Sequence, residues 1–595
     1  MEATFTNLVA MQQSACQRFS DRPLFGTKIA NQHHWMTYTE FAERVNQCRA
    51  GLAQLGIGPG DAVAFISNNR TEWAIAAYAA FGLEALFIPM YLEQHAEDWA
   101  YIINDCQATA LFTSKPQCWK KIDNIKANIP SVKHFISLDE TQPNTIGFND
   151  LCEMGEKNPM MAKTTQQHET CCIAYTSGTT GKPKGVMLSH QNFLFEINAG
   201  LSTFKLTPED RSLSFLPWAH IFGHVTEVHA VIQSGMSTAL VKDIQEILDD
   251  LTTVKPTILY AVPRIFSKIY TGVMEKIARK PKIIQGLFHR GLALSEKQDQ
   301  HYRLTLCEKS ILAFAKKLIF QSILEKFGGR LRLTISGASA LSPKVIRFLH
   351  QIGIPLYEGY GLTETTSAIT VNTREASIVG AVGKALDGCQ IIIDPVNRIT
   401  RDEGEVICYG PNVMQGYYNQ PEKTREVMTA DGGFRTGDIG KLNEDGFLFI
   451  TGRVKDQFKL ENGKFVAPAP IEEQIKLKPL FSHALIYGAN RPFVTALLVI
   501  DTNVLRKAMK KRHINGSIDH ILQRPKTQKL IHKMLNKQVE SFKSYEKPKE
   551  FILLTEDWTI DNELLTPTLK IKRKNIEEKY SDLINTAYEK QETDA

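Results

Sequence analysis

Short apolar segments alternate with longer helix-like stretches between residues 40 and 370. The apolar segments are rich in branched and aromatic side chains, which is typical of buried strands. They are "AVAFIS" (62–67), "ALFIP" (85–89), "TALFTS" (109–114), "HFISL" (134–138), "PTILYAVP" (256–263) and "LRLTISG" (331–337). Strands and helices that alternate at this spacing predict α/β layers with parallel sheet.

Two later stretches have a different pattern. In residues 274–327 apolar residues recur at helical spacing and no proline follows Pro281, so this stretch predicts a long helical insertion. From about 378 to 452, short strand-like runs such as "EGEVICYG" and "NEDGFLFITG" are separated by Gly, Asp and Asn turns. This second pattern predicts a small antiparallel β subdomain.

The pattern changes again after residue 452. "GRVKDQFKLENGKF" (452–465) is charged and bounded by glycines, and it indicates a joint between domains; the strand candidates "HALIYGA" and "TALLVID" follow it. We therefore predict an α/β fold in which a large N-terminal domain (1–452) of layered α/β subdomains includes the β subdomain. A hinge or linker at 453–463 leads to a small α+β C-terminal domain at 464–595.

Residues 73–92, "WAIAAYAAFGLEALFIPMYL", have the length of a membrane span but are interrupted by Gly82, Glu84 and Pro89. A helix that ends near Gly82, followed by a buried strand, explains them better. The N-terminus lacks a basic-then-apolar signal pattern. The ten cysteines form no CxxC pair, which is typical of reduced cytosolic thiols. We expect a cytoplasmic protein, and peripheral contact with a membrane stays open.

The net charge of +6 is unevenly distributed. Residues 455–595 contain 25 Lys and Arg against 19 Asp and Glu, so the first 454 residues sum to zero. Within the C-terminal part, 503–550 has 13 basic and 4 acidic residues. Such a run is most often a solvated helical surface, and it can also bind nucleotide phosphates or lipid headgroups. Nothing in the pattern indicates a nucleic-acid partner.

The stretch "YTSGTTGKPKG" (175–185) has the composition of a phosphate-binding loop, because its glycines, hydroxyls and lysines can surround an anion. It does not fit the Walker A pattern, which needs four residues between its first Gly and Gly-Lys-Ser/Thr. Here only Thr179 and Thr180 separate Gly178 from Gly181, and Pro183 follows the lysine. A P-loop kinase or ATPase is therefore disfavoured.

Two further motifs supply partners for a nucleotide. "YEGYGLTETT" (357–366) offers Tyr360 to stack on a base, Thr363 to contact a phosphate and Glu364 to bind Mg²⁺. "FRTGDIG" (434–440) places Asp438 in a glycine turn, where a carboxylate can accept both ribose hydroxyls. Alone, Thr-Glu-Thr is better explained as a polar turn, and Asp438 is equally compatible with a turn-capping role.

Together and in this order, these motifs, "GRVKD" and the late "LTPTLKIKR" (565–573) strongly resemble the adenylate-forming (AMP-binding) superfamily over nearly the whole chain. The resemblance implies that the mobile phosphate loop includes Thr176, Ser177, Gly178, Thr179, Thr180 and Lys184. It implies that Tyr360 and Gly361 lie at adenine, that Thr363 contacts the α-phosphate and that Glu364, with Thr176, holds Mg²⁺. Asp438 and Arg453 match the ribose ligands, Lys570 the adenylation lysine and Lys455 the hinge. Gly337, Ala338 and Ser339 would pass close to adenine or the acyl chain.

The sequence departs from the family pattern at two positions. Leu569 stands before Lys570 where the family usually has Gly, and Gly433 stands where many relatives have Trp. His220 lies where the family often places a residue beside the acyl carboxylate, although a structural histidine is about equally compatible. Trp218 could gate an acyl tunnel, but a core tryptophan is the simpler interpretation.

The segments around 213–235, 255–270, 328–342 and 456–472 resemble the long-chain fatty acyl-CoA synthetase subgroup. We therefore expect an enzyme that uses ATP and Mg²⁺ to convert a medium- to long-chain fatty acid to acyl-AMP, releasing pyrophosphate, and then transfers the acyl group to CoA. The C-terminal domain would act as a mobile lid that rotates between the two steps. The alternatives are a ligase for an aromatic or short-chain acid, a fatty acyl-AMP ligase that serves a carrier protein, and a non-catalytic lipid- or nucleotide-binding scaffold.

Overall fold

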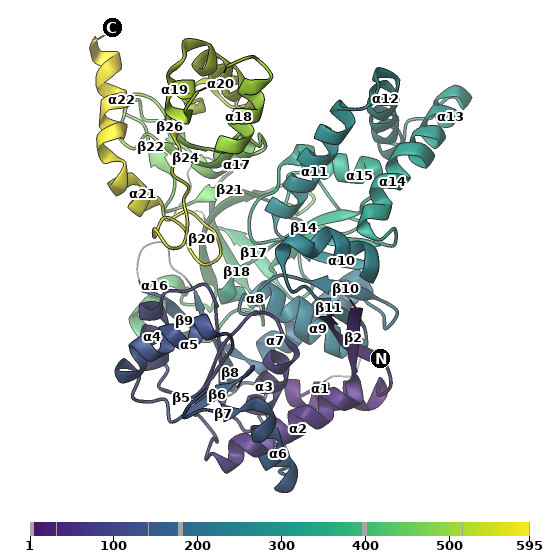
Figure 1. Cartoon of the computed structure of the whole chain (residues 1–595), viewed down its shortest axis with the longest axis vertical. Helices are drawn as coiled ribbons and strands as arrows, with labels where there is room; N and C mark the ends of the chain where they lie inside the picture. Colours follow the sequence, from purple (N-terminus) through teal and green to yellow (C-terminus); the bar gives the residue numbers. More distant parts are fainter. Residues whose placement is uncertain are drawn as a thin grey trace.

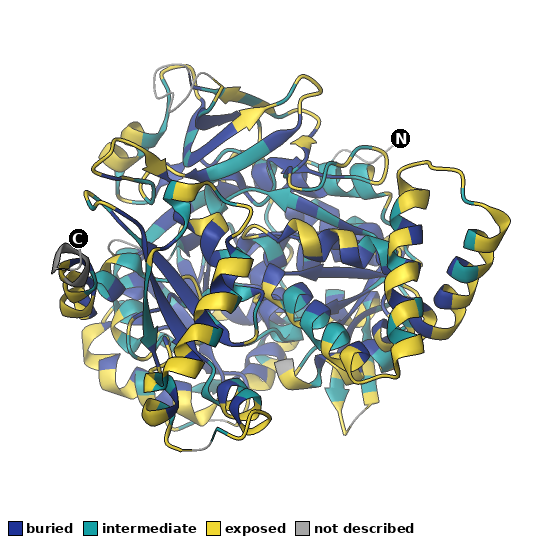
Figure 2. Cartoon of the chain, turned by 90° about the horizontal axis from the view of Figure 1, so that it is seen from above, coloured by how far each residue is buried: buried dark blue, intermediate teal, exposed yellow. Residues whose placement is uncertain are grey.

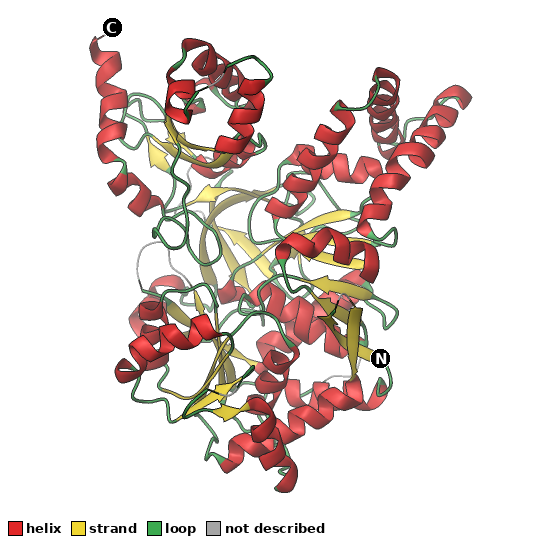
Figure 3. Cartoon of the chain, in the orientation of Figure 1, coloured by secondary structure: helices red, strands yellow, loops and turns green. Residues whose placement is uncertain are grey.

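The computed structural model describes residues 5–30, 32–140, 142–176, 182–394, 402–514 and 516–593. Strands form the interior of the molecule and helices cover them (Figure 3). Seen from above, the central strands are buried, whereas the surrounding helices expose one face to solvent (Figure 2). This mixed α/β architecture confirms the predicted fold class.

One large sheet has the strand order β19-β9-β8-β4-β3-β5-β6-β7. Its centre is parallel, because β3 pairs in parallel with β4 and β5, and β5 with β6. Every residue of β3 is buried, as expected for a strand covered on both faces. The strands are β3 Ala62–Ile66, β4 Leu86–Met90, β5 Ala108–Thr113, β6 His134–Ser137, β7 Ile146–Gly147, β8 Thr170–Thr176, β9 Lys184–Ser189 and β19 Gly416–Tyr417. The helices between them are α2 Tyr38–Gln54, α3 Thr71–Phe81, α4 Ala96–Asp105, α5 Pro116–Ile125 and α6 Phe148–Lys157.

The apolar run 73–92 folds as the sequence predicts. Helix α3 ends at Phe81 with Gly82 as its C-cap, and strand β4 follows. Helix α3 is buried almost all round because it lies within the largest hydrophobic core cluster of the described residues. Within the described residues, no helix combines the length and hydropathy needed to cross a bilayer.

A second large sheet has the order β16-β15-β14-β13-β12-β10-β11-β1-β2, with β10 to β14 parallel. Its strands are β1 Pro23–Ile29, β2 Gln32–Thr37, β10 Arg211–Ser214, β11 Ser237–Leu240, β12 Ile258–Ala261, β13 Leu333–Ser336, β14 Leu356–Tyr360, β15 Thr370–Val371 and β16 Lys384–Ala385. The associated helices are α1 Leu8–Arg18, α7 His190–Phe204, α8 Ile221–Gly223, a π-helix His224–His229, α9 Ala230–Ser234, α10 Ile247–Val254 and α15 Pro343–Ile352.

An aromatic core joins the two large sheets. Trp73 of α3 lies edge-on to Trp218 at 5.6 Å between ring centroids and to His224 of the π-helix at 4.7 Å. Trp218 is 1% exposed and donates its indole N–H to the Ser214 hydroxyl. It is therefore a core tryptophan in this structure, which matches the simpler of the two interpretations.

The stretch predicted as a helical insertion, 274–327, is helical in the structure. It comprises the end of α11 Pro263–Ala278, then α12 Lys282–Asp299, α13 Leu306–Ala315, a π-helix Lys316–Phe320, α14 Gln321–Leu324 and a 3₁₀ turn Glu325–Phe327. Figure 1 shows α12 and α13 extending outward beyond the second sheet. Helices α12 and α15 pack together, so the insertion stays attached to the parallel sheet.

A four-stranded antiparallel sheet follows, in the order β17-β18-β20-β21. Its strands are β17 Gln390–Ile393, β18 Gly404–Tyr409, β20 Phe434–Leu442 and β21 Leu448–Arg453, and α16 Pro421–Val427 precedes β20. The short strands β16 and β19 come from the same stretch of chain but pair with the two large sheets. The β subdomain is thereby tied to both of them.

The last unit contains the sheet β24-β25-β26 and the hairpin β22-β23. Its elements are β22 Phe458–Lys459, β23 Phe465–Val466, α17 Pro468–Lys476, β24 Phe481–Tyr487, β25 Thr495–Ile500, α18 Thr502–Lys510, α19 Ile518–Gln523, α20 Pro525–Gln538, β26 Glu550–Leu554, α21 Arg573–Lys579 and α22 Ser581–Thr593. It has a hydrophobic core of its own. The proposed boundaries and the hinge at 453–463 stay predictions.

Candidate active site

The predicted ribose ligands lie opposite each other on neighbouring strands. Asp438 of β20 is the cross-strand partner of Arg453 of β21, and the Arg453 Nε is 2.9 Å from the Asp438 Oδ1. The Tyr360 hydroxyl, at the end of β14, donates to the Asp438 Oδ2 at 2.8 Å. Asp438 is only 4% exposed, and this burial raises its pKa while Arg453 and Tyr360 oppose the shift. Each carboxylate oxygen keeps a second lone pair for a ribose hydroxyl.

Lys570 lies in a tight turn that faces this group. The Thr566 N–H donates to the Lys570 carbonyl at 2.8 Å, and the Lys570 N–H donates to the Thr566 hydroxyl at 3.1 Å. Leu569, between them, has φ of 60°, a left-handed conformation. Glycine adopts this conformation without strain, which explains physically why glycine is usual before the lysine.

The segment after Lys570 is fixed by a salt bridge within the C-terminal unit. The Arg573 guanidinium lies 2.8 Å from the Glu472 carboxylate of α17 and donates to the Ile486 carbonyl at 2.9 Å. The Ile486 N–H donates to the same Glu472 oxygen at 2.7 Å. Because Glu472 is buried, these contacts hold the residues just beyond Lys570 in one place.

The electrostatic environment of Lys570 links residues from three parts of the chain. Burial and the positive charge of Arg453 lower the pKa of Lys570, while Asp438 and Glu364 act in the opposite direction. Lys570 keeps solvent access, although the protein surrounds its ammonium group. The structure therefore brings Lys570, Asp438, Arg453 and Glu364 together.

His220 belongs to the same neighbourhood. Burial, with a contribution from the charge of Lys570, lowers the pKa of His220 to about 4, so its imidazole is neutral near pH 7. Its Nδ1 accepts from the Phe222 N–H at 3.2 Å. This hydrogen bond assigns the proton of the neutral ring to Nε2, which can donate to a carboxylate.

Glu364, Tyr417 and Lys184 form a second contact group. The Tyr417 hydroxyl donates to the Glu364 carboxylate at 2.9 Å, and the Lys184 ammonium lies 4.6 Å from the centre of the Tyr417 ring. Burial and the nearby Lys423 and Lys455 lower the pKa of Lys184. The predicted hinge residue Lys455 is exposed in the turn after β21, within electrostatic reach of the predicted phosphate lysine.

The phosphate loop is described only at its two ends. Thr176 ends β8 and pairs across the hairpin with Lys184 of β9. The predicted ligands Ser177, Gly178, Thr179 and Thr180 lie outside the described residues. Since Thr176 adjoins Lys184, the ends of the loop lie in the same neighbourhood as Glu364.

The predicted backbone positions follow strands β13 and β14. A Cβ on Gly361 would come 1.6 Å from the Ser367 carbonyl oxygen, so only glycine fits there. Thr363 opens the 3₁₀ turn Thr363–Thr365. Gly337 is buried against Phe222, whereas Ala338 and Ser339 are exposed, and Ala338 has φ of 71°.

Gly433 is explained by its neighbours. A Cβ at this position would lie 2.5 Å from the Tyr409 ring, so the tyrosine fills the space beside Gly433. The Gly433 N–H also donates to the Thr429 hydroxyl at 2.7 Å. A tryptophan could not be placed here without moving Tyr409.

The structure adds two residues that the sequence motifs do not indicate, Glu196 of α7 and Asn412. The Ala368 N–H donates to the Glu196 carboxyl at 3.1 Å, and the Asn412 side chain donates to the Ala368 carbonyl at 3.0 Å. The Thr366 hydroxyl donates to the Asn412 carbonyl at 2.7 Å. These bonds brace a left-handed turn directly after Glu364, in which Thr366 has φ of 53°.

Burial raises the pKa of Glu196 well above its usual value, which favours the protonated carboxyl. A glutamate inside a mostly apolar helix, "NFLFEINAG" (192–200), was the available sequence signal. It could not be interpreted without knowing which face of the helix is buried.

The donor set fits the way proteins usually hold Mg²⁺. Within the described residues, no cluster of three or more His, Cys, Asp or Glu could form a cage. One carboxylate, Glu364, and one hydroxyl, Thr176, are sufficient when substrate phosphates and water complete the shell. Glu364 also keeps acceptor capacity beyond its bond to Tyr417.

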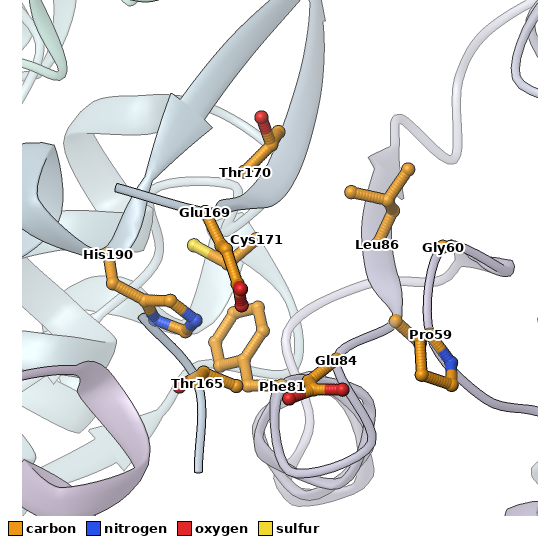
Figure 4. A pocket seen from close by; sticks show the side chains of 11 residues that line it. Pro59, Gly60, Phe81, Glu84, Leu86, Thr165, Glu169, Thr170, Cys171 and His190 are labelled. Atoms are coloured by element: carbon orange, nitrogen blue, oxygen red, sulfur yellow. The ribbon is translucent and has the colours of Figure 1, made fainter. Parts of the chain in front are cut away.

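A cavity of about 270 Å³ lies away from this site. Figure 4 shows Phe81, Glu169 and His190 around it, and it is also lined by Thr170 and Cys171 at the start of β8. The predicted phosphate loop follows the other end of that strand. The cavity is therefore separate from the candidate active site.

Comparison with known proteins agrees with this arrangement. A family model described as AMP-binding enzyme matches residues 12–418, and one described as AMP-binding enzyme C-terminal domain matches residues 455–592. Long-chain-fatty-acid–CoA ligase FadD15 of Mycobacterium bovis is 31% identical over 564 residues, covering 92% of each chain. Long-chain-fatty-acid–CoA ligase 1 of Homo sapiens is 29% identical over 614 residues, covering 98% of this chain and 86% of the relative.

Solved structures share the fold along the chain. The anthranilate CoA ligase AuaEII, in complex with anthranoyl-AMP, superimposes with a TM-score of 0.76 at 19% identity, covering 98% and 99% of the two chains. The A domain of a carboxylic acid reductase from Segniliparus rugosus, with AMP and a carboxylic acid, gives a TM-score of 0.77 at 19% identity, covering 98% and 94%. The fold is thus that of adenylation enzymes. The chain itself belongs to the AMP-binding enzyme family.

The left-handed conformation of Leu569 predicts how this position tolerates substitution. We expect Leu569→Gly to keep full acid-dependent pyrophosphate release, because glycine adopts this conformation freely. Leu569→Val should lower the rate about tenfold, because a β-branched residue is strained there by about 1–2 kcal/mol. Thermal unfolding serves as the folding control. Equal rates for the two variants would show that the turn is not left-handed during adenylation.

The brace at Glu196 gives a second prediction. Glu196→Gln should retain adenylation within about twofold, since a neutral amide replaces a protonated carboxyl. Glu196→Ala should lose about 1–3 kcal/mol of unfolding free energy and require more Mg²⁺ for half-maximal rate, because the turn after Glu364 is no longer held. Titration of the initial rate with Mg²⁺ measures this effect. An equal defect in both variants would mean that Glu196 acts through the negative charge of an ionised carboxylate and not through its hydrogen bonds.

Proposed function

We propose that this chain is an ATP-dependent ligase that converts a medium- to long-chain fatty acid to acyl-AMP and pyrophosphate, and then transfers the acyl group to CoA. The supporting relatives are named long-chain-fatty-acid–CoA ligases and align over nearly the whole chain. The observation that carries the proposal is the convergence of Lys570 with Asp438, Arg453 and Glu364.

In the first step a carboxylate oxygen bonds to the α-phosphorus as the bond to pyrophosphate breaks. Both reactants are negative, so charge must be drawn from the α-phosphate. The Lys570 ammonium would supply positive charge there, and neutral His220 would orient the carboxylate through its Nε2–H. Mg²⁺, held by Glu364 and Thr176, would neutralise phosphate charge when bound. Lys184, at the described end of the predicted phosphate loop, would contribute positive charge toward the β- and γ-phosphates.

In the second step the CoA thiolate attacks the acyl carbonyl, and the bond to AMP breaks. Lys570 is not needed for this attack. The C-terminal unit would rotate about residues 453–463 and withdraw the turn. The hydrogen bond between His95 and the Ile560 carbonyl, at 3.0 Å, would then break. The proposed compartment is the cytoplasm, and peripheral membrane contact stays open.

A substrate panel tests the class of acid. We expect pyrophosphate release with octanoate, dodecanoate, hexadecanoate and octadecanoate, and little release with acetate or benzoate. Pyrophosphate release only with benzoate, or only with acetate, would show that the substrate is an aromatic or a short-chain acid and not a fatty acid. An adenylate that forms but is not consumed by free CoA would identify a fatty acyl-AMP ligase. A complete absence of release with all acids would indicate a non-catalytic scaffold.

The prediction that Lys570 acts in acyl-AMP formation and not in thioester formation is tested by measuring the two half-reactions separately. Lys570→Ala should slow acyl-AMP formation about 10²–10³-fold, which is the usual cost of losing one charge-stabilising donor. Thioester formation from supplied acyl-AMP should remain within a few-fold of wild type. Lys574→Ala is the matched control, because Lys574 forms only an exposed pair with Glu578 on the same segment. Equal loss of both half-reactions in Lys570→Ala would refute the assignment.

A further inference from the structure

The helical insertion exposes more large apolar side chains than any comparable stretch in the described chain. Fourteen large hydrophobic residues are exposed in the described structure, and five of them lie between residues 283 and 318. They are Ile283 at 83%, Tyr302 at 66%, Leu306 at 83%, Phe314 at 56% and Leu318 at 51% exposure. Single exposed apolar residues are normal, but a concentration of them marks an interaction surface.

Helix α13 and the π-helix Lys316–Phe320 that continues it are apolar on two opposite faces. Leu312, Ala315 and Ile319 are buried against the rest of the insertion. Leu306, Ser310, Ala313, Phe314 and Leu318 follow one another at steps of three, four and one residues, so they form a stripe on the other side. The part of the chain that the structure describes leaves this stripe, which we call the α13 stripe, open to solvent.

The stripe belongs to a well-packed hairpin of helices α12 and α13. Lys297 and Glu308 form an ion pair at 3.1 Å between the helices, and Thr305 caps α13 in a capping box with Glu308. A Cβ on Gly291 would come 2.6 Å from the Ala315 Cβ, so the helices approach closely at this point. The exposed apolar side chains are therefore presented by a defined surface.

The hairpin and its flanks are strongly basic. Residues 276–330 contain 12 Lys and Arg against 4 Asp and Glu, a net charge of +8, whereas the whole chain has +6. Arg303, Lys309, Lys316 and Lys317 lie on α13 or next to it and are exposed. Long basic side chains beside apolar ones can keep their charges at a polar boundary while the apolar groups enter a non-polar phase.

A second basic stretch lies at the same end of the molecule. Residues 503–550, with 13 basic and 4 acidic residues, form α18 to α20. Figure 1 shows these helices and the α12–α13 hairpin extending toward the same side, at the top of the view. The excess positive charge is thus gathered at one end, and the rest of the chain is net negative.

We propose that the α13 stripe docks on an anionic lipid bilayer, with Leu306, Phe314 and Leu318 in the headgroup–acyl boundary and the neighbouring Lys and Arg on the lipid phosphates. The bilayer provides both an apolar layer and negative charge. A second copy of this chain would place two surfaces of net charge +8 against each other, which is unfavourable. A nucleic acid would leave the apolar stripe exposed to water. The contact would give the enzyme access to long-chain acids dissolved in the membrane. This role rests on the proposed function.

Tyr302 strengthens this orientation. It lies in the connection between α12 and α13, next to Arg303, and is 66% exposed. Tyrosine is enriched at the membrane–water interface because its ring is apolar and its hydroxyl is polar. The end of the hairpin thus combines an interfacial aromatic residue with a cation.

Vesicle co-sedimentation tests the proposal directly. The full chain should bind vesicles of phosphatidylcholine mixed with phosphatidylglycerol, and bind vesicles of phosphatidylcholine alone at least about tenfold more weakly. Leu306→Ser/Phe314→Ser should lose binding at high salt, where the apolar part dominates. Arg303→Glu/Lys309→Glu should weaken binding about tenfold at low salt. Leu442→Ser/Leu583→Ser, at 37% and 48% exposure elsewhere, is the matched control and should bind like wild type.

The controls separate this proposal from the proposed function. All variants should activate octanoate, offered without vesicles, at the wild-type rate, because the stripe is not part of the candidate active site. If octanoate is not activated but vesicle binding follows the predictions, only the enzymatic proposal fails. If the hairpin variants bind vesicles as well as wild type, the lipid proposal is overturned. It is also overturned if sedimentation shows a dimer that Leu306→Ser/Phe314→Ser dissociates, since the stripe would then bind a second copy.

Discussion

The buried carboxylate of Asp438 is the contact on which the candidate active site depends. It joins β20 to β21 through Arg453 and to β14 through Tyr360, so one side chain connects the antiparallel sheet with a large parallel sheet. It also faces Lys570, which belongs to the C-terminal unit. A buried carboxylate destabilises the folded state unless cationic or hydrogen-bonding partners compensate its charge. Removal of Arg453 would therefore leave Asp438 with an uncompensated buried charge. The site is therefore sensitive to the relative position of both units.

The two positive groups beside Asp438 explain why the arrangement suits an anionic ligand. Burial and the charge of Arg453 lower the pKa of Lys570, and Asp438 and Glu364 compensate only in part, whereas Asp438 raises the pKa of Arg453. A polyphosphate supplies the missing negative charge. Once pyrophosphate has left, less negative charge remains to hold Lys570, which gives an electrostatic reason for the lysine turn to withdraw before the second step.

Much of the fold could be predicted from the sequence because the buried strands are short apolar runs. The runs at 62–67, 85–89 and 256–263 correspond to β3, β4 and β12 within about two residues. Strands β16 and β19 could not be predicted, because they have two residues each and depend on pairing with distant sheets. The motif residues Asp438, Arg453 and Lys570 do converge. The brace at Glu196 and the left-handed Leu569 needed coordinates, because burial and backbone angles decide them.

The proposed enzyme makes an acyl-adenylate, keeps it bound and transfers its acyl group only to a thiol. Rapid quenching of a stoichiometric mixture of enzyme, hexadecanoate, ATP and Mg²⁺ without CoA, followed by mass spectrometry, tests this most directly. Enzyme-bound hexadecanoyl-AMP should accumulate with an equal amount of pyrophosphate, and added CoA should convert it to hexadecanoyl-CoA and AMP. Formation of ADP and orthophosphate, or of hexadecanoyl-CoA without a preceding adenylate, would contradict it.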